Sequence, residues 1–122
     1  MPTIAVHWSK PAPYDGADAS PIPERPGVYE ILVEDDTGID RVFMGETSDL
    51  RRAFIAHLAG RTSSVNLRAR MGMGPSYFRY WMSDAPAERA EVAAALDDKY
   101  DYECGTDYFD GEIALVRVHE EE

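Results

Sequence analysis

Arginine is concentrated in one segment of this sequence. Residues 51–80 contain six arginines and no aspartate or glutamate. A guanidinium group forms paired hydrogen bonds with phosphate or with carboxylate. The segment therefore predicts a surface that faces DNA phosphates or an acidic partner, and the alternative is an ordinary surface that balances acids elsewhere in the chain. The arginines are Arg51, Arg52, Arg61, Arg68, Arg70 and Arg79.

Other chemistry finds little support in the residue spacing. The three histidines, His7, His57 and His119, lack the spacing of metal ligands. The glycines at 71–74 are not followed by the lysine and hydroxyl residue of a phosphate-binding loop. A single cysteine, Cys104, excludes an internal disulfide framework. Aromatic residues in the strand-like segment 76–82 would stack on bases or pack in a core equally well.

The composition predicts one acidic domain. A chain of 122 residues with 44% hydrophobic residues is large enough to bury a core. The 23 acidic and 12 basic residues give a formal net charge of -11, which argues against a general nucleic-acid coat. Scarce lysine fits a salt-rich habitat or a GC-rich genome. No apolar run is long enough to span a membrane, and no signal peptide is evident, so we expect a cytoplasmic protein.

The chain is organised around residues 27–58, where two strands lead directly into a helix. We expect strands over 28–33 and 41–44, joined by a turn at 34–40. An amphipathic helix follows, with Ser48 as its N-cap, Asp49 in its first turn and Gly60 as its end. Its apolar stripe is Leu50, Phe54 and Leu58, with Ala53 and His57 on the same side.

The remaining elements complete an α+β fold with a small antiparallel sheet flanked by helices. The expected strands are 2–8, 76–82 and 112–118, the first and last pairing with each other, and the expected helices are 65–70 and 87–99. Residues 9–26 form a proline-rich arm, and Glu120 to Glu122 a solvated acidic tail. Within one compact unit we distinguish an N-terminal strand and arm (1–24), a central domain (25–104) and a C-terminal strand and tail (105–122).

The central unit resembles the GIY-YIG nuclease family. The resemblance is carried by the motif Gly27-Val28-Tyr29, by Phe43-Met44-Gly45 and by the run from Glu46 to Arg52 that enters the helix. The order of elements, β-β-α-α-β-α over roughly residues 25–103, agrees with it. The resemblance implies hydrolysis of DNA phosphodiesters with one divalent metal ion, Mg²⁺ or Mn²⁺.

The site implied by the resemblance is only partly present. Tyr29 matches the tyrosine of the first triplet, and His57 lies where some members carry a histidine on the helix. Phe43 replaces the second tyrosine, and Ala53 replaces the catalytic arginine, so Arg52 would have to act in its place. The metal-binding glutamate aligns nearest Glu91, with Glu88 close by. The resemblance therefore implies Tyr29, Arg52 and His57 as catalytic residues and Glu91 as the metal ligand.

Three functions remain open at this stage. The first is a GIY-YIG-fold domain whose catalysis is impaired by the changes at Phe43 and Ala53 and which binds a nucleic acid or another partner. Loss of a group that stabilises developing charge costs about 10²–10³ in rate. The second is an active endonuclease using Arg52, His57 and Glu91. The third is an adaptor whose arginine segment binds an acidic protein, including another copy of this chain; the DNA contacts of the first two would involve Arg51, Arg61, Arg68, Arg70 and Arg79.

Overall fold

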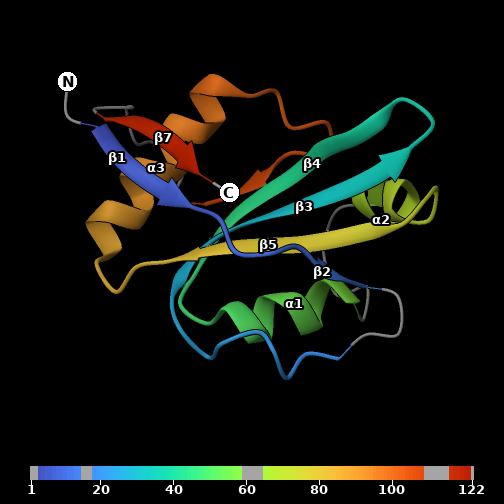
Figure 1. Cartoon of the computed structure of the whole chain (residues 1–122), viewed down its shortest axis with the longest axis horizontal. Helices are drawn as coiled ribbons and strands as arrows, with labels where there is room; N and C mark the ends of the chain where they lie inside the picture. The colour runs from blue at the N-terminus through green and yellow to red at the C-terminus, as the bar shows by residue number, and fades with distance from the viewer. Residues whose placement is uncertain (1–2, 15–17, 59–64, 109–115, 122) are drawn as a thin grey trace.

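The chain folds around a five-stranded sheet in the order β2-β5-β3-β4-β6, with a separate pair of strands, β1 and β7 (Figure 1). The computed structural model describes residues 3–14, 18–58, 65–108 and 116–121. The predicted α+β architecture is confirmed, including the hairpin with a further strand and the terminal strand pair. The strands are β1 (Thr3–His7), β2 (Ala12–Pro13), β3 (Gly27–Asp35), β4 (Gly38–Thr47), β5 (Ser76–Met82), β6 (Thr106–Asp107) and β7 (Arg117–Glu121).

The β3–β4 hairpin is longer than the sequence pattern suggests. Asp35 pairs with Gly38, so only two residues connect the strands and the turn predicted at 34–40 is wrong in extent. Gly38 has a φ of 126°, a backbone conformation that residues with a side chain rarely adopt, so this tight turn favours glycine. The register shifts between Ile31, which pairs with Phe43, and Leu32, which pairs with Arg41, so β4 carries one extra residue at this point.

Three helices are described, and their predicted positions are confirmed within a few residues. They are α1 (Leu50–Leu58), α2 (Val65–Met71) and α3 (Pro86–Lys99). Ser48 is not the N-cap of α1, because the carboxylate of Asp49 accepts the Arg52 backbone N–H at 3.1 Å and satisfies the first turn. Gly60, the predicted end of this helix, lies outside the described residues.

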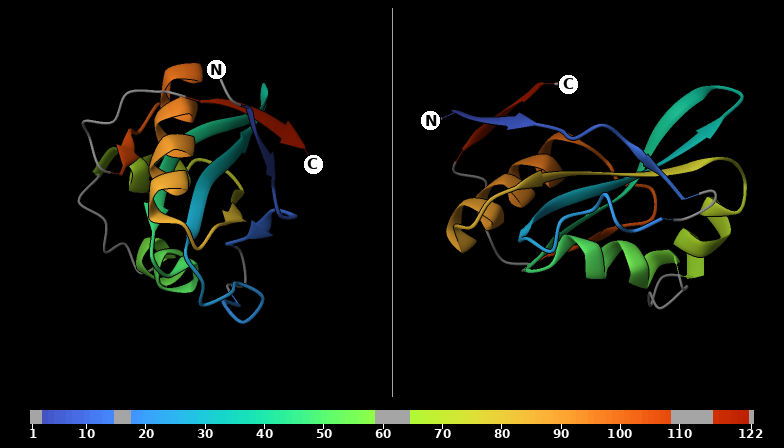
Figure 2. Two further views of the ribbon diagram at one scale, coloured as in Figure 1. Left: turned by 90° about the vertical axis from the view of Figure 1, so that its left-hand side faces the viewer. Right: turned by 60° about the horizontal axis from the view of Figure 1, so that its bottom comes forward.

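The sheet separates two apolar clusters. Helices α1 and α2 cover one face, where Tyr29, Phe43, Phe54 and Phe78 pack together. Helix α3 and the β1–β7 pair cover part of the other face, where Val28 and Met44 belong to the second cluster. The right-hand view of Figure 2 shows α1 and α2 on one side of the strands and α3 with β1 and β7 on the other. Consecutive residues of β3 therefore serve different environments.

The ends of the chain meet in the β1–β7 pair, which is parallel and runs from Thr3 opposite Arg117 to His7 opposite Glu121. The predicted pairing of the terminal strands is confirmed, although β7 extends further toward the C-terminus than the predicted 112–118, of which 112–115 lie outside the described residues. The prediction of a solvated tail is wrong at Glu120. Its side chain is largely buried, because cations and aromatic donors from other elements surround it.

Two short strands escaped prediction. Ala12 and Pro13 in the proline-rich arm pair with β5, and Thr106 and Asp107 pair with β4. Two residues carry no periodicity, so such strands are defined only by the backbone they pair with. The arm is nevertheless anchored, since Tyr14 stacks on Phe54 with a centroid distance of 4.5 Å.

Candidate functional site

Tyr29 and Gly45, one from each triplet of the predicted motif, are cross-strand partners. The Tyr29 ring lies directly across Gly45. A Cβ atom at position 45 would come within 2.4 Å of the Tyr29 Cζ and Oη atoms. Packing alone therefore requires glycine at this position, independent of any catalytic role.

The Tyr29 hydroxyl makes a hydrogen bond with His57 Nε2 at 2.9 Å. The two residues reach each other because Leu50, Phe54 and His57 form the buried stripe of α1, which packs on the sheet face that carries Tyr29. Tyr29 is 2% exposed and His57 is buried. The structure thus brings together two of the residues that the resemblance implies.

Aromatic rings enclose this pair. Phe43 packs against Tyr29 with a centroid distance of 6.2 Å and against His57 at 5.1 Å. Phe78 stacks on the opposite side of Tyr29 at 5.0 Å. The ring at position 43, where the family has a second tyrosine, therefore contributes apolar contact without a hydroxyl group.

Burial keeps both partners neutral. It raises the pKa of Tyr29, and the nearby carboxylates of Asp107 and Glu46 raise it further. Burial lowers the pKa of His57, although the charge of Asp107 acts in the opposite direction. His57 Nδ1 has no hydrogen-bond partner in the described part of the chain. A phenol with a raised pKa stays protonated near neutral pH, so the phenolate that could act as a base is not populated.

Arg52 does not join the pair. It is exposed on α1 and lines a shallow hollow of the outer surface together with Glu24, Asp49 and Ile55. Ala53, the position expected to hold the catalytic arginine, packs partly buried against the core. The side of α1 that approaches Tyr29 therefore offers an imidazole and apolar groups, and no guanidinium.

Glu91 belongs to a helix on the other face of the sheet. Its neighbours on α3, Val92 and Leu96, pack with Val28 and Met44, whereas the Tyr29 ring lies in the opposite cluster. Glu88 accepts a hydrogen bond from the Ser83 hydroxyl at 2.8 Å. Among the described residues there is no group of three or more histidine, cysteine, aspartate or glutamate side chains that could hold a metal ion.

Several arginines of the predicted patch bind carboxylates of this chain. Arg51 pairs with Glu24 at 2.5 Å. Arg70 is buried between Asp35 at 2.8 Å, Asp40 at 2.9 Å and Glu103 at 3.1 Å. Arg79 is buried against Glu30, while Arg52 and Arg68 are exposed and Arg61 lies outside the described residues. The segment is thus largely neutralised by acids from elsewhere in the sequence.

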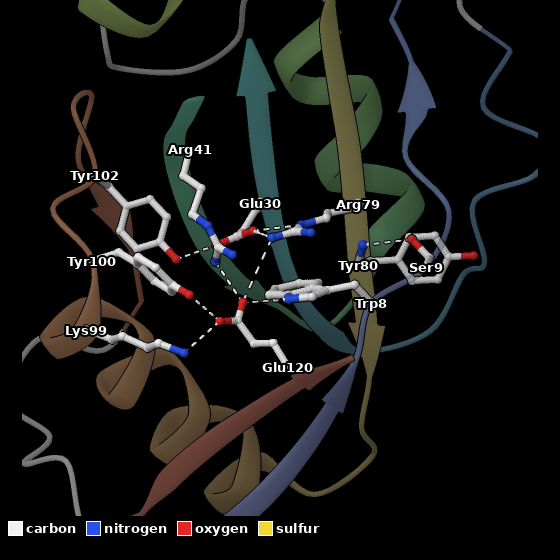
Figure 3. A network of polar contacts seen from close by, with 10 residues as sticks. All are labelled: Trp8, Ser9, Glu30, Arg41, Arg79, Tyr80, Lys99, Tyr100, Tyr102 and Glu120. Carbon is white, nitrogen blue, oxygen red and sulfur yellow. Dashed lines mark hydrogen bonds and ion pairs between the residues drawn. The ribbon is translucent and has the colours of Figure 1, made fainter. Parts of the chain in front are cut away.

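Sequence reasoning missed a buried polar network on the α3 face of the sheet (Figure 3). Its centre is Glu30, which is 0% exposed. Glu30 accepts hydrogen bonds from Arg79 Nε at 2.8 Å, from Arg41 Nη1 at 2.9 Å and from the Tyr102 hydroxyl. The only signal in the sequence was a carboxylate in an otherwise apolar strand, since a buried charge of this kind requires partners.

Glu120 extends this network to the C-terminal strand. It accepts hydrogen bonds from Trp8 Nε1 at 2.8 Å, Arg41 Nη1 at 2.7 Å, Lys99 Nζ at 3.0 Å and the Tyr100 hydroxyl. Burial alone would raise the pKa of Glu120, but these donors outweigh it and lower the pKa to about 2. The network therefore fastens β7 and β1 to the main sheet.

The chain matches no family model, no curated protein and no solved structure. The likeness to GIY-YIG nucleases accordingly rests on the residues of the two triplets and on the order of elements. Among the described helices, none combines the length and the apolar character needed to cross a bilayer.

Proposed function

We propose that this chain is a non-catalytic binding module built on a GIY-YIG-like scaffold. The observation that carries the proposal is the enclosure of Tyr29. The phenol that would act on a phosphodiester is 2% exposed and hydrogen-bonded to His57 beneath Phe43. The β-β-α-α-β-α order of β3 to α3 supports the scaffold.

Hydrolysis of a phosphodiester needs a base, a cation near the developing charge and a way to position the phosphate. Tyr29 is enclosed and its pKa is raised, while Ala53 occupies the expected arginine position. Arg52 lies outside the enclosed pair. Tyr29 therefore offers no accessible base, and the face of α1 next to it offers no guanidinium for the developing charge.

The donors also do not fit the metal that the family implies. Mg²⁺ and Mn²⁺ favour several oxygen ligands around one point. The described residues hold no such cluster, and α3 places Glu91 on the opposite side of the sheet from Tyr29. We assign no metal-dependent step to this chain.

The charge distribution favours a partner other than DNA. The net charge is -11, and Arg51, Arg70 and Arg79 are held by Glu24, Asp35 and Glu30, among other carboxylates. Binding to a phosphate backbone depends on cations that can displace its counterions. We infer that the module binds a protein or a small molecule.

A cleavage assay tests the loss of catalysis. Supercoiled plasmid and branched DNA are incubated with the protein and with Mg²⁺ or Mn²⁺. We expect the wild type to cleave no faster than the Tyr29→Phe variant. Turnover that disappears in Tyr29→Phe but persists in the matched variant Tyr77→Phe, a β5 tyrosine that binds Glu34, would overturn the proposal in favour of an active endonuclease.

A binding assay tests the choice of partner. Fluorescence anisotropy with labelled single- and double-stranded DNA should give no saturable binding at physiological salt. If binding occurs, and if it weakens with salt and in the Arg52→Gln and Arg68→Gln variants of the two exposed arginines, the module binds nucleic acid instead.

A further inference from the structure

A second hollow of the molecule lies on the α3 face of the sheet, away from Tyr29. Its volume is about 610 Å³. Its lining comes from the end of β1 and the residues that follow it, together with residues of β3, β4 and β5. Figure 1 shows this segment after β1 running to β2 along β5. The lining residues are His7, Trp8, Ser9, Lys10, Pro11, Leu32, Ile39, Arg41 and Arg79.

The lining combines an apolar surface with positive charge. The exposed side chains of Pro11 and Ile39, the latter 58% exposed, supply most of the apolar part, and the buried side chains of Trp8 and Leu32 contribute only their edges. Lys10, Arg41 and Arg79 supply the cations, and no aspartate or glutamate among the described residues lines the hollow, although Glu30 and Glu120 pair with the two arginines from the interior. On a chain with a net charge of -11, the charged side chains that line this hollow are therefore opposite in sign to the molecule as a whole. An anionic ligand with an apolar body matches both properties.

Two side chains that line the hollow, Trp8 and Arg79, also belong to the polar network around Glu30 and Glu120. The Arg79 guanidinium lies over the Trp8 ring, 4.5 Å from its centroid, and Trp8 is fixed by its hydrogen bond to Glu120. Both side chains are almost fully buried, so their positions are set before any ligand arrives.

Arg41 provides a donor at the surface of the network. Its side chain is 26% exposed, and it uses the single nitrogen Nη1 for both Glu30 and Glu120. One face of the guanidinium lies over the Tyr100 ring, 3.8 Å from its centroid, which holds the plane of the group in place. A guanidinium with this geometry can add a carboxylate or phosphate oxygen without giving up its internal partners.

We propose that this hollow binds a small organic anion, a carboxylate or phosphate attached to an aromatic or aliphatic body. The anionic group would contact Arg41 and Lys10, and the body would lie against Pro11 and Ile39, next to the edge of the Trp8 ring. The volume is within the range of about 300–1,000 Å³ usual for small-molecule sites. The inference goes beyond the proposed function, because it holds whether or not Tyr29 takes part in hydrolysis.

The test uses two probes that differ only in charge. Indole-3-acetate and its neutral amide, indole-3-acetamide, are titrated into the full chain, and the two tryptophan indole N–H signals are followed by NMR. Both tryptophans belong to the apolar cluster around Val28, but only Trp8 is among the residues that line the hollow, so Trp81 serves as an internal control. We expect a saturable shift of the Trp8 signal by the acetate with a dissociation constant of about 1 mM, as for a fragment-sized ligand. The dissociation constant of the amide should be at least about fivefold higher than that of the acetate.

Matched variants assign the contacts. Lys10→Gln should weaken the acetate about fivefold and leave the amide unchanged, since Lys10 is exposed and holds no element in place. Arg68→Gln removes the same charge from α2 and should change neither. Inorganic phosphate should compete with the acetate if the anionic group alone is recognised, and failure to compete at about tenfold excess indicates that carboxylate is the preferred class.

Three results would overturn the inference. They are equal affinity for the acetate and the amide, a shift of Trp81 without Trp8, and the absence of any saturable shift at about 10 mM probe, ten times the expected constant. None of these bears on DNA cleavage, so the inference and the proposed function fail separately.

Discussion

Tyr29 and Glu30 are neighbours in β3 and are both buried, but the desolvation cost of their polar groups is offset in different ways. Tyr29 faces α1, where burial keeps it and His57 neutral among aromatic rings. Glu30 faces the β1–β7 side, where Arg79 and Arg41 compensate its charge. The first environment avoids charge and the second pairs it.

The comparison shows where the chain departs from a nuclease-like site. The resemblance lies on the Tyr29 face, and there the polar groups are few and enclosed. The ionic groups, including two arginines outside the triplets, gather on the Glu30 face and hold the terminal strands. We therefore expect variants on the Glu30 face to affect folding most, and variants on the Tyr29 face to affect it less.

The largest effect is expected for Glu30→Gln. Removing one partner of a buried ion pair leaves uncompensated charge, which costs about 3–5 kcal/mol of unfolding free energy. Here both Arg41 and Arg79 would lose their shared carboxylate. Urea denaturation measures the change. Glu24→Gln, which removes an exposed carboxylate that pairs with Arg51, should cost at most about 1 kcal/mol; equal effects of the two variants would show that the Glu30 network contributes no more than a surface pair.

Gly45→Ala should have the next largest effect, on the Tyr29 face. The added Cβ would stand 2.4 Å from the Tyr29 ring, so ring and strand must move apart. Overpacking of this kind costs about 1–3 kcal/mol. Gly72→Ala is the control, since its nearest neighbour would be an ordinary 3.5 Å contact. A loss of the Tyr29–His57 contact in the NMR spectrum would accompany the destabilisation, and a Gly45→Ala protein as stable as Gly72→Ala would contradict the packing explanation.

The long helices and strands could be predicted from the sequence, but the contacts between distant segments could not. Strand β5 and helix α3 were predicted from their residue types and from the proline at the start of each, whereas β2 and β6 have two residues each and are too short to show a periodic pattern. Counting charges within residues 51–80 predicted a positive patch. It could not foresee that Asp35, Asp40 and Glu103 would converge on Arg70. A segment's charge describes a surface only when the acids brought in by the fold are known.

The candidate site shows the same division. Tyr29 and His57 were selected through the resemblance, and the structure brings them within 2.9 Å. No pattern in the sequence indicated that Phe43 would pack against His57, or that Glu91 would belong to the other face. Both contacts depend on which face of the sheet α1 and α3 pack against.

A smaller loss is expected for Tyr29→Phe. The hydroxyl is removed while the ring is kept, so His57 Nε2 loses its partner inside an apolar cluster. An unsatisfied buried polar group of this kind costs about 1–2 kcal/mol. Combining Tyr29→Phe with His57→Phe should cost less than the sum of the two single variants, because the second change removes the orphaned atom. Additive costs would show that the hydrogen bond contributes little to stability.

The smallest effect is the dependence of stability on pH that His57 produces. Burial lowers the pKa of His57, so the unfolded chain, with a histidine pKa of about 6.5, binds more protons than the folded one. Stability should therefore be complete above pH 6.5 and decrease as the pH falls below it. Glu120, with a pKa of about 2, affects stability only where carboxylates in the unfolded chain become protonated, around pH 4.5 and below, so it does not contribute between pH 7 and 5. A variant without the imidazole isolates the contribution of His57 within this window. His57→Gln keeps a hydrogen-bonding partner for Tyr29 without a titrating group, and urea denaturation across this window should give it a flatter profile than the wild type. Identical slopes for the two proteins would mean that the imidazole accepts a proton in the folded state as easily as in water, and the enclosure of the Tyr29–His57 pair would then be wrong.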